Sequence, residues 1–367
     1  MKPSILFSSA IATLFVLSAA GPAADPLPGM PPVLDKRDIY SADEAGDLSP
    51  VVRKFPSLVY VPNSGSNSVD IIDPRTYHII GHFRVGRQPQ HVTPSYDLKT
   101  LWVLCDLGDS LTLIDPATGK KGKTINVKDP YNMYYTPDGK YAIVVAERIH
   151  RLDFRDAQTM RLVKSLPVPC RGIDHMDFSA NGRYLIASCE FAGAVVKVDV
   201  ETQTVVGTLD LPGGGSGMPQ DVKLSPDGEV FYVADMKADG VHLIDGERMR
   251  ILGFMPTGKG AHGLYASRDS KVLYVSNREE GSVSVIDFAS RKIVHKWEIP
   301  HGTPDMGGVS ADGKVLWLSG RYSKEVYAID TGDGHLLARI HVGKGPHGLC
   351  VYPQPGRYSL GHTGVFR

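Results

Sequence analysis

Histidine, carboxylate and arginine side chains recur at two equivalent places in this 367-residue sequence. The first place is the start of one strand of a repeating unit, which carries these residues in order: His91, Asn132, His175, Asp221, His262, Met306 and His347. The second place is the end of the following strand, with Ser64, Asp106, Glu147, Glu190, Met236, Arg278 and Arg321. Imidazole and carboxylate groups are ligands for zinc, copper or iron, and arginine binds carboxylates through paired hydrogen bonds. These residue types therefore permit metal binding, or recognition of a carboxylate-bearing ligand, if the fold brings them together.

Charges in the second series are segregated by sign. Copies two to four carry the acids Asp106, Glu147 and Glu190, whereas copies six and seven carry Arg278 and Arg321. In an antiparallel pair, the start of one strand and the end of the next meet at the same edge of the sheet. We therefore expect both series on one rim, with acids and arginines on opposite sides and the histidines of the first series around the mouth of a channel.

Three of these residues are candidates for direct metal ligation: His91, His175 and Glu190. His175 lies beside Asp174 and Arg171, and this cluster departs furthest from the repeat consensus, so the fourth copy is the first choice for chemistry. The residues alone leave an alternative open. Histidines at strand starts also hydrogen-bond to loop backbone, and charges at strand ends are ordinarily solvated.

The elements that position these side chains come from a repeat. An apolar residue followed by aspartate recurs about every 43 residues, as Ile72-Asp73, Ile114-Asp115, Leu152-Asp153, Val198-Asp199, Ile244-Asp245, Ile286-Asp287 and Ile329-Asp330. Each unit holds short β-rich runs bounded by turn residues, without the period of a long helix. Four short strands per unit indicate a propeller blade. We interpret the repeated aspartate as a turn former, because its carboxylate accepts hydrogen bonds from backbone amides two residues ahead.

The seven units are expected to close into a ring. The first unit begins with its second strand, Leu58 to Pro62, and an unpaired first strand, His347 to Tyr352, lies near the end of the sequence. Pairing of these two segments would complete the first blade and hide strand edges that favour aggregation. The sequence thus predicts an all-β fold over residues 51–367: a seven-bladed β-propeller with four antiparallel strands per blade. The 39 glycines and 26 prolines agree with its many turns.

The first fifty residues differ from the repeats. Lys2 precedes an apolar run from Ile5 to Ala20 that ends in small residues, a pattern typical of a secretory signal peptide. We predict that residues 1–24 are removed and that the protein is exported to the periplasm or secreted; an uncleaved anchor is the alternative. Residues 25–50 are predicted to be a mobile, Pro-rich linker. No membrane span is expected in the mature form.

The charge balance excludes some partner classes. The 40 lysines and arginines equal the 40 aspartates and glutamates in number. Binding to nucleic acid or to an acidic membrane surface requires an excess of positive charge on one face or segment. We therefore expect no nucleic-acid partner, and we expect a monomer.

Three segments resemble a known family. Tyr60-Val61-Pro62-Asn63, Tyr274-Val275-Ser276-Asn277 and Pro346-His347-Gly348-Leu349 are similar to the repeats of exported YVTN-type β-propeller proteins. The resemblance covers all seven units and implies a seven-bladed propeller. It also implies wider similarity to the haem-binding propellers of dissimilatory nitrite reductases and to propeller lactonases. That family has no single chemistry, so the resemblance does not decide the function.

The cysteines give one further expectation. The first two strands of the fourth unit form a hairpin, and counting along its arms places Cys170 and Cys189 near the same open end. A disulfide between them is therefore reasonable in an exported protein. Cys105 and Cys350 have no evident partner. The sequence contains no Cys-x-x-Cys, which excludes covalent haem attachment and a zinc ribbon.

Three functions remain open at this stage, and the cofactor is unknown. We favour a non-catalytic binding or scaffold protein whose loop face holds a protein or a small carboxylate-bearing ligand at the channel mouth. No nucleophile motif such as Gly-x-Ser-x-Gly is present. The first alternative is a propeller that handles a metal or haem. The second is a lactonase-like enzyme with His175 or His91 as general base and Glu190 in support.

Overall fold

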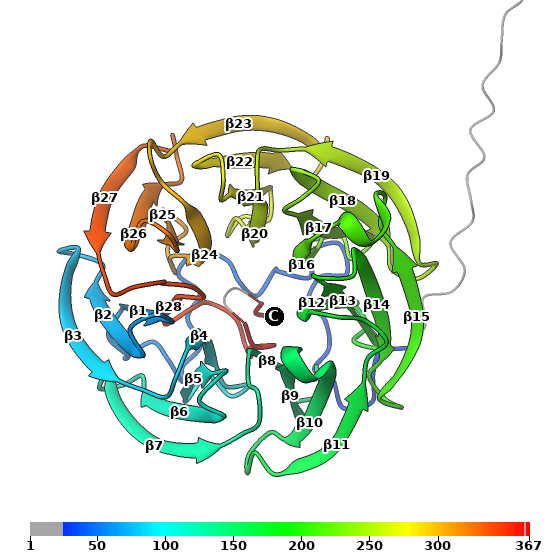
Figure 1. Cartoon of the computed structure of the whole chain (residues 1–367), viewed down its shortest axis with the longest axis horizontal. Helices are drawn as coiled ribbons and strands as arrows, with labels where there is room; N and C mark the ends of the chain where they lie inside the picture. Colours follow the sequence, from blue (N-terminus) through cyan, green and yellow to red (C-terminus); the bar gives the residue numbers. More distant parts are fainter. Residues whose placement is uncertain (1–24, 363–364) are drawn as a thin grey trace, which may run out of the picture.

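Seven four-stranded antiparallel sheets form a ring in the computed structural model, which describes residues 25–362 and 365–367 (Figure 1). We call the region around the axis of the ring, between the inner strands, the channel. The predicted signal peptide lies outside the described residues. From the innermost strand outward, blade one contains β28 (Cys350–Tyr352), β1 (Leu58–Asn63), β2 (Ser68–Asp73) and β3 (His78–Arg84). Blade two contains β4 (Pro89–Pro94), β5 (Leu101–Cys105), β6 (Ser110–Asp115) and β7 (Lys120–Asn126); blade three contains β8 (Asn132–Tyr135), β9 (Tyr141–Ala146), β10 (Arg151–Asp156) and β11 (Leu162–Pro167). These strands follow the predicted propeller pattern.

The other four blades have the same order. Blade four contains β12 (Ile173–Phe178), β13 (Tyr184–Cys189), β14 (Ala194–Asp199) and β15 (Thr204–Asp210); blade five contains β16 (Pro219–Leu224), β17 (Phe231–Asp235), β18 (Gly240–Asp245) and β19 (Arg250–Pro256). Blade six contains β20 (Ala261–Ala266), β21 (Val272–Asn277), β22 (Ser282–Asp287) and β23 (Lys292–Glu298); blade seven contains β24 (Pro304–Val309), β25 (Val315–Gly320), β26 (Glu325–Asp330) and β27 (Leu336–His341). The predicted all-β, seven-bladed fold is confirmed. No helix in this described part of the chain is long and apolar enough to cross a membrane.

Burial follows the position of a strand within its blade. Every residue of the inner strand β12 is buried, whereas the outer strand β15 alternates between exposed and half-buried residues. Inner strands are covered by neighbouring blades on both faces, so they tolerate continuous apolar or fully paired polar sequences. An outer strand packs on one face only and shows the period of two. The core is therefore a set of apolar layers between blades, and polar side chains on inner strands are buried beside the channel.

Six of the seven repeated aspartates end the third strand of their blade and form turns, as predicted. Asp153 is the exception: it lies inside β10, where the Ser165 hydroxyl donates to it at 2.6 Å, and Asp156 forms the turn of blade three instead. In blade two, Asp115 Oδ1 accepts a hydrogen bond of 3.0 Å from the backbone N–H of Ala117. Asp73 accepts one of 2.9 Å from Arg75 N–H, and Asp330 accepts one of 2.8 Å from Gly332 N–H. The same contact in different blades agrees with a structural role for this position.

The ring closes through the last strand. β28 pairs antiparallel with β1, with Leu58 opposite Tyr352 and Tyr60 opposite Cys350. The strand is shorter than the predicted His347 to Tyr352, because the chain before it bridges instead to His91 through Gly348. A Cβ atom at Gly348 would lie 1.9 Å from Nδ1 of His91, so glycine is required where this backbone passes the channel.

Residues 25–50, expected to be a mobile linker, lie packed against the propeller. Leu27 N–H donates to Asn181 O at 2.8 Å, Ile39 N–H to Pro226 O at 2.8 Å, and Gly46 N–H to Ala311 O at 2.8 Å. Leu27, Ile39 and Tyr40 are buried, so this segment contributes apolar side chains that the prolines around them concealed. The segment covers the face of the ring opposite to the rim that carries the two polar series.

Residues 358–362 and 365–367 lie beside the inner strands on the face covered by residues 25–50, and Figure 1 marks the C-terminus near the centre of the ring. Tyr135 N–H donates to Leu360 O at 2.8 Å, and His362 N–H donates to Met133 O at 3.0 Å. Arg367 forms a buried ion pair of 3.1 Å with Asp177. This segment thereby brings a histidine from outside the repeats beside the inner strand of blade three.

Candidate functional site

Five buried histidines of the described chain lie together in the channel. His91, His175 and His262 come from the inner strands β4, β12 and β20, His347 precedes β28, and His362 belongs to the C-terminal segment. The ring centroids of His91 lie 5.3 Å from His175, 4.8 Å from His347 and 5.3 Å from His362. The structure thus brings together all four histidines predicted at the channel mouth and adds a fifth.

His91, His175 and His362 form what we call the three-histidine cluster. Each ring offers one nitrogen as a ligand atom, and these three nitrogens all lie within 4.8 Å of one another. Asp174 Oδ1 lies 2.7 Å from Nδ1 of His175, and the side-chain amide nitrogen of Asn132 lies 3.1 Å from Nδ1 of His362. Within the described residues, both ring nitrogens of His91 and of His175, and Nε2 of His362, have no hydrogen-bond partner, so the contact of His175 with Asp174 is close but lacks hydrogen-bond geometry.

The charge state of this cluster follows from its burial. Burial lowers the pKa of His91 and of His362 well below the usual value for imidazole. Burial also lowers the pKa of His175, but the carboxylate of Asp174 outweighs it and leaves that pKa raised. The cluster therefore contains at least two neutral imidazoles, the form in which histidine binds metals.

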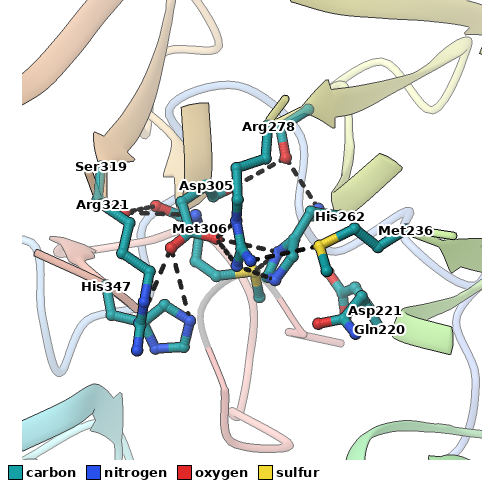
Figure 2. A network of polar contacts seen from close by, with 12 residues as sticks. Gln220, Asp221, Met236, His262, Arg278, Asp305, Met306, Ser319, Arg321 and His347 are labelled. Carbon is teal, nitrogen blue, oxygen red and sulfur yellow. Dashed lines mark hydrogen bonds and ion pairs between the residues drawn. The ribbon is translucent and has the colours of Figure 1, made fainter. Parts of the chain in front are cut away.

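His262, Asp305 and His347 form a second set, the Asp305 group, which Figure 2 shows together with the arginines that contact it. Arg278 donates to Asp305 Oδ1 from Nε at 3.1 Å and from Nη2 at 2.5 Å, and it also contacts Nε2 of His262. Arg321 Nη1 lies 3.9 Å from Asp305 Oδ2, and His347 Nε2 lies 3.7 Å from the same oxygen. A guanidinium group thus already neutralises the carboxylate of this group.

The acids of the rim gather on the other side. Burial raises the pKa of Glu147 to about 8 and that of Glu190 to about 7, and the nearby carboxylate of Asp174 adds to both shifts. Tyr131 lies between the two sides: its ring is 5.3 Å from that of His91, and the charges of Glu147, Glu190 and Arg321 all act on its hydroxyl. This arrangement agrees with the expected segregation of acids and arginines.

Asp106 takes part in a different contact. Arg148 Nε lies 3.1 Å from Asp106 Oδ1 and 2.6 Å from Asp129 Oδ1, so these residues form an ion network between blades two and three. Asp106 therefore has a local partner that the alignment of strand ends did not show.

Three channel residues were missing from the sequence prediction: His362, Asp305 and Tyr131, which stands one position before Asn132. His362 lies in a segment outside the repeats, where no alignment of units reaches it. Asp305 stands one position before Met306 at the start of the inner strand of blade seven, just as Asp174 stands before His175. A comparison of the residue preceding each strand start would have found Asp305; nothing in the repeat pattern pointed to His362.

The disulfide expected at this rim is present. Cys170 and Cys189 are bonded, with their Cα atoms 5.9 Å apart. Cys189 is the last residue of β13, directly before Glu190, and Cys170 lies three residues before β12. The bond therefore joins the two chain segments that carry Asp174, His175 and Glu190.

These features define the class of protein as a seven-bladed β-propeller with a polar, histidine-rich channel. A profile of the YNCE-like β-propeller family matches residues 47–356, and the chain belongs to that family. Among curated proteins it is 21% identical over 269 residues to the uncharacterized protein YncE of Salmonella typhi, which covers 68% of this chain and 73% of that protein. The resemblance predicted from the repeats is confirmed.

Solved structures with different chemistry share the fold. Hydrazine synthase of Kuenenia stuttgartiensis matches with a TM-score of 0.65 and 21% identity, over 77% of this chain and 98% of that chain. Dihydro-heme d1 dehydrogenase NirN in complex with DHE matches with a TM-score of 0.60 and 18% identity, over 90% of this chain and 83% of that chain. At these identities the likeness shows the fold alone.

Proposed function

We propose that this chain is an exported metal-binding protein whose channel holds one transition-metal ion on His91, His175 and His362. The observation that supports the proposal is the convergence of three buried imidazoles, each of which has at least one ring nitrogen without a hydrogen-bond partner within the described chain. Buried polar atoms without partners cost free energy, and a metal ion removes that cost for all three rings at once.

The donor set suits the first-row metals that bind imidazole. Zinc, copper, iron and nickel accept neutral histidine ligands, with metal–nitrogen distances of about 2.0–2.1 Å for zinc. Tetrahedral bonds of that length place nitrogens ~3.4 Å apart, so small ring rotations from within 4.8 Å complete the site. Three protein ligands also leave a fourth position open, as in zinc sites that bind water or substrate.

The surroundings support the same conclusion. Histidine ligands of metals ordinarily hydrogen-bond through the second ring nitrogen, often to a carboxylate, and Asp174 offers a carboxylate oxygen 2.7 Å from Nδ1 of His175. The proposal keeps His91 and His175 from the sequence candidates and replaces Glu190 by His362. It also retains a binding role through the loop face, because the opposite face is covered by the N- and C-terminal segments.

A haem group does not fit the centre of the channel. The NirN structure is a complex with DHE, but here the rings of His91 and His347, and those of His175 and His362, lie with centroids 4.8 Å apart. Leu360 and Tyr358 of the C-terminal segment are buried in the apolar cluster formed by blades three and four. The proposal therefore includes no haem chemistry.

Elemental analysis of the purified exported protein tests the proposal. After treatment with a chelator and dialysis against Zn²⁺, we expect one ion per chain, and Co²⁺ in its place should give visible absorption bands. His91→Ala and His362→Ala should lose the ion, whereas His335→Ala, which removes an exposed histidine of blade seven, should retain it. Circular dichroism would verify that each variant is folded. A folded wild-type protein that takes up no metal would overturn the proposal.

A further inference from the structure

Arg321 has an incomplete set of partners at the mouth of the channel. Its Nη1 atom is buried, and among residues 25–362 and 365–367 it has no hydrogen-bond partner; the same holds for Asp305 Oδ2. These two atoms lie 3.9 Å apart, which is too long for a hydrogen bond. Nδ1 of His347 is also buried without a partner in this part of the chain. Arg321 Nη1 and His347 Nδ1 therefore remain available to a ligand.

Arg278 does not share this property. Its guanidinium is bound by Asp305 and His262, and it lies 3.4 Å from the sulfur of Met236. Two guanidinium groups thus lie near the single carboxylate of Asp305, and Arg278 forms the shorter contacts with it. The side of the mouth that carries Arg321 retains positive charge beside the three-histidine cluster.

We propose that Arg321 binds a small monocarboxylate whose oxygen occupies the open position of the metal ion on the three-histidine cluster. This inference rests on the proposed metal site and names the ligand that the site takes. The ring of His347, whose free Nδ1 is part of the subsite, lies 4.8 Å from that of His91, so the arginine subsite and the metal are adjacent. Neutral imidazole ligands leave the full charge on the ion, which therefore favours an anion in its open position.

The chemical class follows from shape and charge. The planar guanidinium matches a carboxylate, which accepts two parallel hydrogen bonds. Tyr131 and the histidines are buried around the subsite, so a ligand of few atoms fits best. Glu147 and Glu190 lie on the opposite side of the mouth, where burial and the carboxylate of Asp174 already disfavour negative charge and raise the pKa of both, so a second negative charge on the ligand would be unfavourable there. A monocarboxylate meets all three conditions.

Titration of the Co²⁺-loaded protein with acetate, and with the uncharged analogue acetamide, tests this inference. Acetate should shift the Co²⁺ absorption bands in a saturable way, and acetamide should not. Arg321→Met should keep one Co²⁺ per chain and weaken acetate binding by about tenfold, the loss expected for one charge-assisted contact. Arg171→Met is the matched control, since Arg171 lies on the same rim and donates to Phe191 O at 3.0 Å; it should behave as the wild type.

The outcomes separate the two proposals. Co²⁺ bands that do not respond to acetate, or an acetate affinity unchanged in Arg321→Met, would overturn the carboxylate subsite and leave the metal site intact. A protein that binds no Co²⁺ would overturn the metal site itself, and the subsite with it. Bands that respond equally to acetate and acetamide would show an open metal position without selection for charge, which also contradicts the inference.

Discussion

The three-histidine cluster and the Asp305 group offer similar ligand atoms within one channel, and they differ in their neighbours. Each contains three side chains whose ligand atoms lie within 4.8 Å of one another. The carboxylate of the Asp305 group is held by Arg278 at 2.5 Å, whereas the three-histidine cluster has a carboxylate beside it, with Asp174 Oδ1 2.7 Å from Nδ1 of His175. A fixed cation competes with a metal for the same carboxylate. The contacts around a donor set, and not its residue types alone, therefore decide whether it holds an ion.

Removal of Arg278 should have the largest effect on stability and zinc binding, because it frees the Asp305 group from the arginine that donates to its carboxylate. Arg278→Met leaves the buried carboxylate of Asp305 with Arg321 alone, 3.9 Å away, and the loss of the hydrogen-bonded partner of a buried pair costs about 3–5 kcal/mol of unfolding free energy. Zinc should then bind the Asp305 group, restore part of that stability and raise the stoichiometry from one ion per chain to two. Denaturant unfolding with and without zinc, together with elemental analysis, measures both effects.

The matched control for this variant is Arg171→Met, which should change neither quantity. Unchanged stability in Arg278→Met would contradict the assigned role of Arg278, and a stoichiometry that stays at one ion would contradict the idea that the cation excludes a metal.

The second-largest effect should come from removal of one histidine, and it should differ between the three-histidine cluster and the Asp305 group. His362→Ala should weaken zinc binding by more than the ~10–100-fold loss typical of a missing outer-shell partner, whereas His347→Ala should leave the affinity for zinc nearly unchanged. His362 also tests whether the C-terminal segment completes the site, because Leu360 and Arg367 hold that segment independently of the histidine. Competition of each protein with a chromophoric chelator measures the affinities; equal losses in both variants would remove the distinction between the groups.

The repeat pattern explains why the meeting of four of the five channel histidines was predictable from the sequence. Four histidines occupy equivalent strand starts, and in a closed ring equivalent positions on inner strands must converge on the axis. Their meeting in the channel therefore follows from the period of the sequence, as do the seven blades and the pairing of β28 with β1.

The fifth histidine and the arginine partner of Asp305 were not predictable, because their positions depend on contacts between segments that the repeat does not relate. His362 reaches the cluster through a segment beyond the last blade, and Arg278 reaches Asp305 across the interface between blades six and seven. The burial of Ile39 and Tyr40 likewise depends on gaps between blade turns that only the assembled ring creates. Composition marked that segment as a linker because its prolines outweigh its few apolar residues.

The carboxylate behind the three-histidine cluster should have a moderate effect. Asp174→Asn removes the charge that orients and polarises His175, and the expected loss of zinc affinity is about 10–100-fold with the stoichiometry retained. Glu190→Gln is the control, because this rim acid was a metal candidate from the sequence and is not a ligand in the proposed site; its zinc affinity should change by less than about tenfold. Calorimetric titration of both variants measures the difference. A larger loss in Glu190→Gln than in Asp174→Asn would return Glu190 to the ligand set.

The smallest effect should come from the repeated aspartates, which resemble the channel acids in type and differ from them in role. Asp115 is exposed and accepts hydrogen bonds from Ala117 N–H at 3.0 Å and from the Thr118 hydroxyl at 2.8 Å. Asp115→Ala removes these turn contacts, and we expect a loss of about 0.5–1.5 kcal/mol of unfolding free energy, the usual net value of a hydrogen bond. Zinc affinity and stoichiometry should not change, since blade two would keep the position of His91. A change in metal affinity without a matching loss of stability would show that turn geometry in the blade controls the channel, and the separation of scaffold from site would then be wrong.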